Sequence, residues 1–167
     1  STRKCMVQCG CMILYGIFAT LFANRIFFFR VTPEEMNPLF WVVMGAAAIT
    51  VNAGSAMIIA QSEIGYLADL EPFVEGASLV LWAWATWWIP LLVIFGIWRH
   101  IVRKVPLTYS PMYWSLVFPL GMYTVATWQF ATADNFSFMK EIPSYTIWIA
   151  LTAWLVTATG LVRSIFR

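Results

Sequence analysis

"YWSLVFPLGMYTVATWQF" (residues 113–130) contains no charged residue and reads as one apolar helix with a proline inside it. Pro119 directly follows Phe118 and precedes Gly121 by two residues. A proline inside a helix costs about 3 kcal/mol, because it removes one backbone hydrogen bond and its ring clashes with the preceding turn. The stretch therefore predicts a helix that is interrupted at Pro119. The cost of this interruption suggests that the proline has a structural or functional role.

The lack of charge in this stretch recurs along the whole chain. Of 167 residues, 61% are hydrophobic and 11% are charged, whereas a soluble domain averages about 45–50% and about 25%. Five windows contain no charge at all: 5–24, 36–62, 76–98, 105–133 and 142–162. Each is about as long as the ~20 apolar residues with which a helix crosses the hydrocarbon core. The sequence predicts an all-α, polytopic transmembrane protein.

The windows translate into about five spans within one transmembrane domain, residues 1–167. Their approximate limits are 5–29, 38–61, 72–98, 111–133 and 144–162. Prolines 38, 72, 111 and 143 lie at or just before four of the starts, where a missing N–H does least harm. The chain starts without methionine and the number of spans is odd, so we expect it to be a fragment of a longer membrane protein.

Basic residues indicate the orientation. The connection 99–110 has no acid and carries Arg99, Arg103, Lys104 and the only histidine, His100. The connection after the second span has three acids and no base. The positive-inside rule then places the 99–110 connection and the C-terminus in the cytoplasm. We expect a multi-pass protein of the plasma or inner membrane, and no nucleic-acid partner, because the net charge is only +2.

No catalytic, metal or cofactor site is predicted. Cys5, Cys9 and Cys11 lack a fourth ligand at a suitable spacing, so we interpret them as packing residues. A membrane b-type cytochrome needs axial ligands inside the bilayer, whereas His100 lies at a helix end. Acids and bases stand at the membrane surface, so no nucleophile–base pair can be built. We do not expect an enzyme.

The second span has a different composition from its neighbours. In "WVVMGAAAITVNAGSAMIIA" (41–60), Ala46, Thr50 and Gly54 repeat every four residues, which allows close approach of another backbone or of a permeant. Asn52 is a buried amide that needs partners. Tight helix packing explains the small residues equally well.

The fourth span combines the break at Pro119 with hydroxyl side chains, including Thr124. Broken helices near the midplane are a recurrent device of transporters, since a freed carbonyl must be satisfied by neighbours or by water. The first and third spans are bulky instead, with "IFFF" (26–29) and "LWAWATWWIPLL" (81–92). They are predicted to form an outer layer around the second and fourth.

Three of these stretches together resemble one family. "YWSLVFPLGMYTVAT" resembles the aromatic-Trp-x-x-x-Phe-Pro helix of the tellurite-resistance/dicarboxylate transporter family, which includes the slow-type anion channels of guard cells. "LFWVVMGAAAITVNAGS" is similar to that family's preceding pore helix, and "LWAWATWWIPLLVIFGIWRH" to the outer helix between the two. The resemblance covers nearly the whole chain, in order.

The resemblance implies a homotrimer in which this chain supplies spans six to ten of a ten-span pore built from helical hairpins. Odd-numbered helices line that pore, so the second and fourth spans would be pore helices. Phe118 matches the phenylalanine that occludes the pore. On this hypothesis Pro119 bends the helix so that Phe118 projects into the conduit, and Gly121 lets the bend pack without collision. The candidates for the lining are Thr50, Asn52, Gly54, Gly121 and Thr124.

The resulting functional hypothesis is transport of small anions through a pore gated by Phe118. A channel and a carrier, for inorganic anions or for C4-dicarboxylates, stay open, as does a role in tellurite resistance. A dicarboxylate carrier is expected to place Arg or Lys in the conduit; these spans have none, which favours monovalent anions. Arg99, Arg103 and Lys104 would concentrate anions at the cytoplasmic mouth, or would only determine topology.

Two other function classes compete with transport. A non-transporting membrane scaffold or assembly subunit would use the proline break as a packing feature. A redox subunit would need haem or quinone. Anion flux into liposomes separates the first alternative from transport, and absorbance of the purified protein tests the second.

Overall fold

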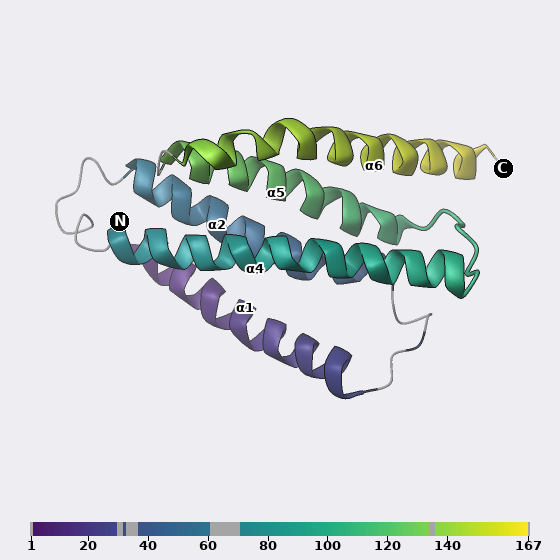
Figure 1. Ribbon diagram of the computed structural model, residues 1–167, viewed down its shortest axis with the longest axis horizontal. Coiled ribbons are helices and arrows are strands. Elements are labelled where there is room, and N and C mark those ends of the chain that lie inside the picture. Colours follow the sequence, from purple (N-terminus) through teal and green to yellow (C-terminus); the bar gives the residue numbers. More distant parts are fainter. Residues whose placement is uncertain (1, 30–31, 33–36, 61–70, 134–135, 167) are drawn as a thin grey trace.

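The computed structural model describes residues 2–29, 32, 37–60, 71–133 and 136–166, with side chains except those of residues 2–9, 11, 12 and 60. This part of the chain contains helices and no strand (Figure 1). The long helices are α1 (Thr2–Phe28), α2 (Val42–Ala60), α4 (Glu71–Ile97), α5 (Trp114–Ala133) and α6 (Ile142–Ile165). They coincide with the five predicted windows, so the prediction of an all-α protein is confirmed.

Short helices stand at the starts and ends of the long ones. They are η1 (Pro38–Trp41) before α2, the π-helical turn η3 (Trp98–Val102) after α4, η4 (Pro111–Tyr113) before α5 and η5 (Ser137–Lys140) before α6. Asn37 Oδ1 accepts a hydrogen bond from Leu39 N (2.9 Å), and Ser110 Oγ accepts one from Met112 N (3.3 Å). These side chains cap helix starts whose first residue is a proline, as the sequence predicts.

Three helical segments in the described part are long and apolar enough to cross a membrane. They are Pro38–Ile59, Glu71–Val102 and Ser137–Ile165. α1 contributes a shorter apolar stretch, Ile13–Phe28. α5 is not among these three segments, because its threonine, tyrosine and glutamine side chains lower its mean hydropathy. The crossing of the membrane by α1 and α5 stays a prediction.

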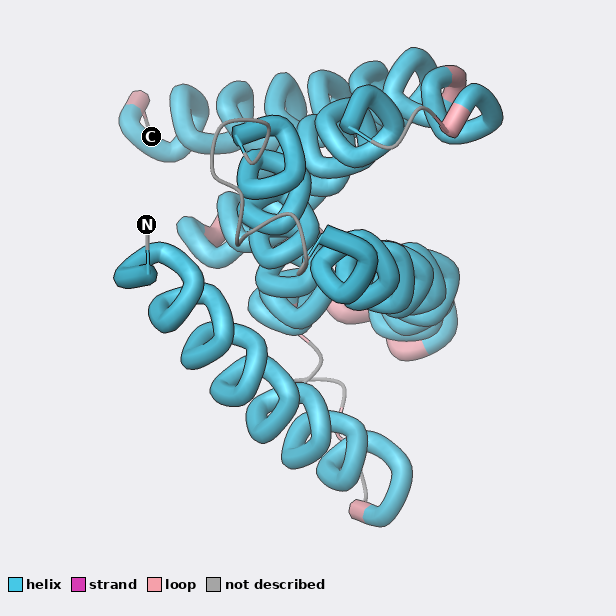
Figure 2. Tube along the Cα trace, turned by 90° about the vertical axis from the view of Figure 1, so that its left-hand side faces the viewer, coloured by secondary structure: helices cyan, strands magenta, loops and turns pink. Residues whose placement is uncertain are grey.

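α2 is the central helix. It packs extensively on both α4 and α5, which meet each other mainly through long side chains, whereas α6 packs on α5 (Figure 1). The buried share of the most apolar window is 56% in the segment containing α2, against 17% for α4 and 6% for α6. α1 contacts mainly α2 and leans away from the other helices (Figure 2). The inner position predicted for the second span agrees with this packing, whereas the fourth span is covered by α6 as well as by α2.

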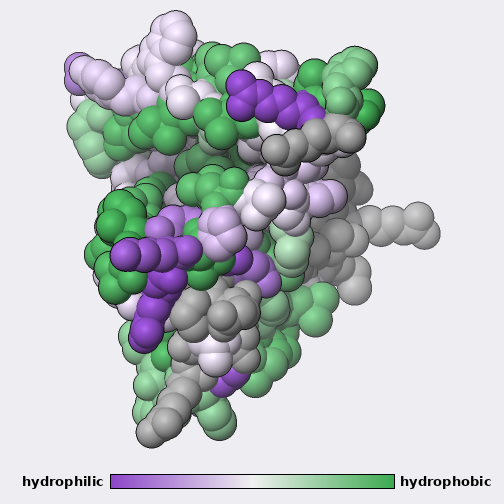
Figure 3. All heavy atoms as spheres, turned by 90° about the vertical axis from the view of Figure 1, so that its right-hand side faces the viewer, coloured by the Kyte–Doolittle hydropathy of each residue, from purple (hydrophilic) through white to green (hydrophobic). Residues whose placement is uncertain are grey.

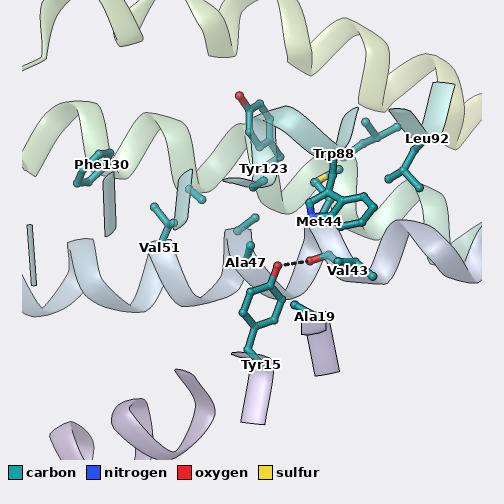
Figure 4. Packing of buried hydrophobic residues seen from close by; sticks show 14 of the residues in the cluster. Tyr15, Ala19, Val43, Met44, Ala47, Val51, Trp88, Leu92, Tyr123 and Phe130 are labelled. Carbon is teal, nitrogen blue, oxygen red and sulfur yellow. Dashed lines mark hydrogen bonds between the residues drawn. The ribbon is translucent and has the colours of Figure 1, made fainter. Parts of the chain in front are cut away.

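The core lies where α2 meets its neighbours (Figure 4). Small and medium residues of α2 are fully or nearly fully buried there, and large side chains of α4 and α5, such as Trp88 and Phe130, cover them. The hydroxyl of Tyr15 on α1 donates to the carbonyl oxygen of Val43 at 3.1 Å, which attaches α1 to α2. Packing is thus tightest along α2, as its run of small residues allows.

Among the residues whose side chains are described, the acids gather at one end of the bundle and most of the bases at the other. We use "basic end" for the end with Arg25, Arg99, Arg103, Lys104 and Arg163 and "acidic end" for the end with Glu71, Glu75, Glu141 and Lys140, where α1 also begins with Arg3 and Lys4. α2 and α5 both run from the basic to the acidic end, while α4 and α6 run back (Figure 1). Figure 3 looks onto the basic end, where hydrophilic side chains gather among hydrophobic ones.

Candidate functional site

Phe118 projects outward from an inner helix. Its side chain is 57% exposed, although the next two residues of α5 are buried. The ring borders a groove of about 350 Å³ between α2 and α5. The groove is lined by Val42, Gly45, Ala46, Ile49, Trp114, Ser115, Phe118 and Pro119. An aromatic ring that stays exposed on the central pair of helices is a candidate for contact with a permeant or with a further part of the protein.

Polar contacts on the opposite side of α5 fix this orientation of Phe118. Trp82 Nε1 on α4 donates to Thr127 Oγ1 at 3.0 Å, and the hydroxyls of Thr86 and Tyr123 lie 2.8 Å apart. Thr127 is nine residues after Phe118, which at about 100° per residue is the other side of an α-helix. Because α4 holds that side, Phe118 faces away from α4.

Pro119 packs directly on a glycine of α2. A Cβ atom added to Gly45 would lie 2.8 Å from Pro119 Cγ and 2.9 Å from its Cβ. The proline ring is rigid, so α2 and α5 reach this separation only because Gly45 has no side chain. Nothing among the described residues lies within 4 Å of a Cβ added to Gly121. The packing role that the sequence suggested for Gly121 therefore belongs to Gly45.

The proline also changes the hydrogen bonding of the groove. Pro119 has no N–H, so the carbonyl oxygen of Ser115, one turn earlier, lacks its helical donor. α5 nevertheless continues through Pro119 as one helix (Figure 1). Ser115 borders the same groove as Phe118. A carbonyl freed inside a membrane needs water or another polar partner, and the groove gives such a partner access.

Thr50 and Thr124, two of the residues predicted to line the conduit, are buried, and their hydroxyls form hydrogen bonds to other parts of the helices. Thr50 is 8% exposed and donates to the carbonyl oxygen of Ala46 at 3.0 Å. Thr124 is also 8% exposed, and its Oγ1 lies 3.0 Å from the carbonyl oxygen of Leu120 and 3.0 Å from Thr146 Oγ1 of α6. Neither residue borders the Phe118 groove.

Asn52 and Gly54 lie farther along α2, toward the acidic end. Asn52 is half-buried, and its Oδ1 makes no hydrogen bond within the described part of the chain. Gly54 is buried. A buried amide oxygen without a donor costs free energy, so Asn52 is suited to a polar partner from outside these helices. The lining of a conduit by Asn52, Gly54 and the other candidates stays a prediction.

The three predicted mouth residues lie together at the basic end, but in different surroundings. Arg99 is half-buried and borders a cavity of about 320 Å³ between η1, η3, α4 and α5. Arg103 is exposed, with its guanidinium carbon 5.0 Å from the centre of the Trp98 ring. Lys104 is exposed and has a φ of 54°. Only Arg99 is therefore built into a site.

The described residues contain no group of three or more His, Cys, Asp or Glu side chains that could hold a metal ion. The side chains of Cys5, Cys9 and Cys11 lie outside the described part, so their interpretation as packing residues stays a prediction.

Comparison with known proteins identifies a family model and several related proteins. Residues 4–162 match the family model SLAC1, voltage-dependent anion channel. Two proteins of Mycobacterium tuberculosis, both named as uncharacterized membrane proteins, are 38% identical over 152 residues, which is 91% of this chain and 77% of theirs. An uncharacterized transporter of Methanocaldococcus jannaschii is 24% identical over 154 residues, 92% of this chain and 43% of its own length. No solved structure matches the chain.

Proposed function

Because the chain belongs to the voltage-dependent anion channel (SLAC1) family, we propose that its α2–α5 face forms part of an anion pore in which Phe118 is the gate. Membership confirms the resemblance that the Phe118–Pro119 helix suggested. The family consists of membrane channels and transporters rather than enzymes. The chain spans 43% of the archaeal transporter that it matches, so the activity of a whole pore is part of the proposal.

The proposal that Phe118 is the gate rests on the exposure of its side chain. A large aromatic ring is 57% exposed on one of the two central helices, above a groove whose α2 wall is small and apolar. Contacts with α4 hold the ring in this direction from behind. An aromatic ring in this position can close a narrow conduit and open it by a small rotation.

Small monovalent anions are the proposed substrates. No Lys or Arg is among the residues that line the Phe118 groove. A conduit of this kind holds an anion weakly, through dipoles and hydroxyls, and the anion can leave again. A doubly charged dicarboxylate would need a base that these helices do not offer. Nitrate or chloride should therefore pass faster than a C4-dicarboxylate.

Reconstitution tests the proposal. The complete protein is inserted into liposomes, and the flux of chloride, nitrate and a C4-dicarboxylate is compared with that of empty vesicles. Flux of the monovalent anions above the empty vesicles is expected. A folded, correctly inserted protein that gives no more flux than empty vesicles would contradict the proposal and favour a scaffold.

The orientation can be checked by labelling. We expect a cysteine in place of Val105, at the basic end, to react only from the cytoplasmic side. A cysteine in place of Ala68, in a connection outside the described residues, should react only from the outer side. A membrane-impermeant thiol reagent added to intact cells and to inverted vesicles gives the measurement. Reversed labelling would overturn both the cytoplasmic C-terminus and the position of the basic mouth.

Removal of the mouth charges should have a modest effect. We expect the triple substitution of Arg99, Arg103 and Lys104 by glutamine to lower outward anion current less than tenfold, and less at high salt, because exposed charges are screened over about 10 Å at 0.1 M salt. Current recorded at low and high ionic strength checks this. Complete loss of current from a folded protein would instead indicate a binding site on the conduction path.

Family resemblance also supports a homotrimer in the plasma or inner membrane. Light scattering of the detergent-solubilised protein, corrected for bound detergent, should give three copies per particle. A monomer in several mild detergents would argue against the trimer.

A further inference from the structure

The cavity at the basic end has an apolar body. It lies between the start of α2 and the end of α4, and its walls include Phe40, Trp41, Leu92, Gly96, Leu107 and Leu116. Its volume of about 320 Å³ is at the lower limit of roughly 300–1,000 Å³ for pockets that enclose small ligands. It is separate from the Phe118 groove and shares no lining residue with it.

The rim of this cavity is cationic and fixed in place. Arg99 and His100 border it from the π-helical turn η3, and both are half-buried. His100 Nδ1 lies 2.9 Å from the carbonyl oxygen of Val105. A carbonyl oxygen only accepts, so Nδ1 carries the hydrogen, and Nε2 can donate to an anion when the ring carries its second proton as well.

The backbone after η3 is folded tightly to hold this rim. Val105 N donates to the carbonyl oxygen of Arg99 at 3.2 Å, and Arg103 N donates to that of Trp98 at 2.9 Å. Lys104 adopts a φ of 54°, which is uncommon for a residue other than glycine. π-helical turns and such backbone conformations are found often at functional sites.

We infer that this cavity binds an anionic phospholipid, with part of an acyl chain in the apolar body and the phosphate at Arg99 and His100. Guanidinium groups form strong hydrogen bonds with phosphate oxygens, and basic pockets between membrane helices are suited to lipid head groups. The acids in the described part of the chain, Glu71, Glu75 and Glu141, all lie at the opposite end. The inference does not depend on Phe118 lining a conduit.

A lipid fits this cavity better than a free anion does. Nearly the whole wall is hydrocarbon or aromatic, and only the rim is charged. A small hydrated anion would gain nothing from the apolar body, whereas an acyl chain can pass from the bilayer into it without exposing apolar surface to water. The neighbouring Trp41 and Tyr113, which also border the cavity, are side chains typical of the membrane interface.

Native mass spectrometry tests this inference through lipid retention. The protein is reconstituted in phosphatidylcholine with one-fifth phosphatidylglycerol, extracted, and scored for each bound lipid. Wild-type protein should retain phosphatidylglycerol in excess of its share. Arg99→Gln should reduce this preference at least fivefold, since it removes the charge-assisted hydrogen bonds of the guanidinium to the phosphate. Arg103→Gln removes the same charge from an exposed side chain and should leave the preference nearly unchanged.

A second pair of variants tests the acyl chain. Gly96 borders the cavity and has nothing within 4 Å of an added Cβ, so Gly96→Leu fills the cavity with little strain. Gly76 on the same helix is equally unobstructed but lies near the acidic end, so Gly76→Leu is the matched control. Gly96→Leu should retain less of both lipids, whereas Gly76→Leu should behave as wild type.

Three results would overturn the inference. Equal effects of Arg99→Gln and Arg103→Gln would mean diffuse surface charge rather than a site. Unchanged retention in a folded Gly96→Leu protein would place the acyl chain elsewhere. Displacement of the lipid by inorganic phosphate in the buffer would mean that the rim takes the free ion. If Gly96→Leu does not fold, the comparison of Arg99→Gln with Arg103→Gln still tests the lipid site. None of these measurements uses anion flux, so they are independent of the proposed pore.

Discussion

Replacing Phe118 by alanine should increase anion flux several-fold while leaving the free energy of unfolding nearly unchanged. The ring is 57% exposed and borders an open groove. Its removal therefore breaks few packing contacts, and we expect a cost below about 1 kcal/mol, against roughly 3–5 kcal/mol for a buried phenylalanine. If the ring closes the conduit, the shorter side chain widens the narrowest point. Flux into liposomes and thermal unfolding of the same preparation give the two readouts.

Phe130→Ala is the matched control for this substitution. Phe130 is on the same helix, but its side chain is fully buried and its ring centre lies 5.7 Å from that of Phe136. We expect this variant to lose roughly 3–5 kcal/mol of stability and to gain no flux. If Phe118→Ala is stable but flux does not rise, the exposed ring faces lipid or another part of the protein, and the gate is refuted.

The limits of the helices could be predicted from the sequence because charge is excluded from the apolar windows. The expected start at 111 and end at 133 of the fourth span agree with η4 and α5. Prolines at the helix starts supplied a second local signal. Composition also identified α2 and α5 as inner helices, since small residues allow close packing whereas the Trp-rich third span needs space around it.

Contacts between distant residues could not be predicted in this way. The four-residue repeat drew attention to Ala46 and Thr50, yet the residue that meets Pro119 is Gly45. Which glycine faces a proline depends on the relative rotation and axial position of two helices, and neither is encoded in one helix alone. A run of small residues next to a proline-containing span is the signal that narrows the search.

The candidate site shows the same limit. Phe118 was selected by resemblance, but its exposure depends on how Trp82 and Tyr123 hold the other side of α5. Arg99 and Arg103 are indistinguishable as charges in one short connection. Only the fold of the π-helical turn places Arg99 at a cavity and Arg103 over Trp98. Topology follows from charge, whereas a site follows from tertiary packing.

Replacing Gly45 by alanine should destabilise the folded protein, because one added methyl group collides with a rigid ring. Its carbon would lie 2.8 Å from Pro119 Cγ and 3.2 Å from Pro119 Cα. Overpacking of this kind costs about 1–3 kcal/mol, and α2 must move away from α5. We therefore expect a lower unfolding temperature together with a large loss of anion flux, because the same displacement distorts the groove beside Phe118.

Two control variants test whether the loss of stability comes from the contact with Pro119 rather than from helix propensity. Gly121→Ala makes the same change at a position with nothing within 4 Å of the added Cβ, so it should be neutral or stabilising by up to about 1 kcal/mol. Pro119→Gly removes the ring that collides, and the double variant with Gly45→Ala should be more stable than the sum of the two single effects predicts. An interaction free energy of about 1–3 kcal/mol in this cycle is expected. Additive effects would show that Gly45 is needed for a reason other than its contact with Pro119, and the steric account of the α2–α5 packing would then fail.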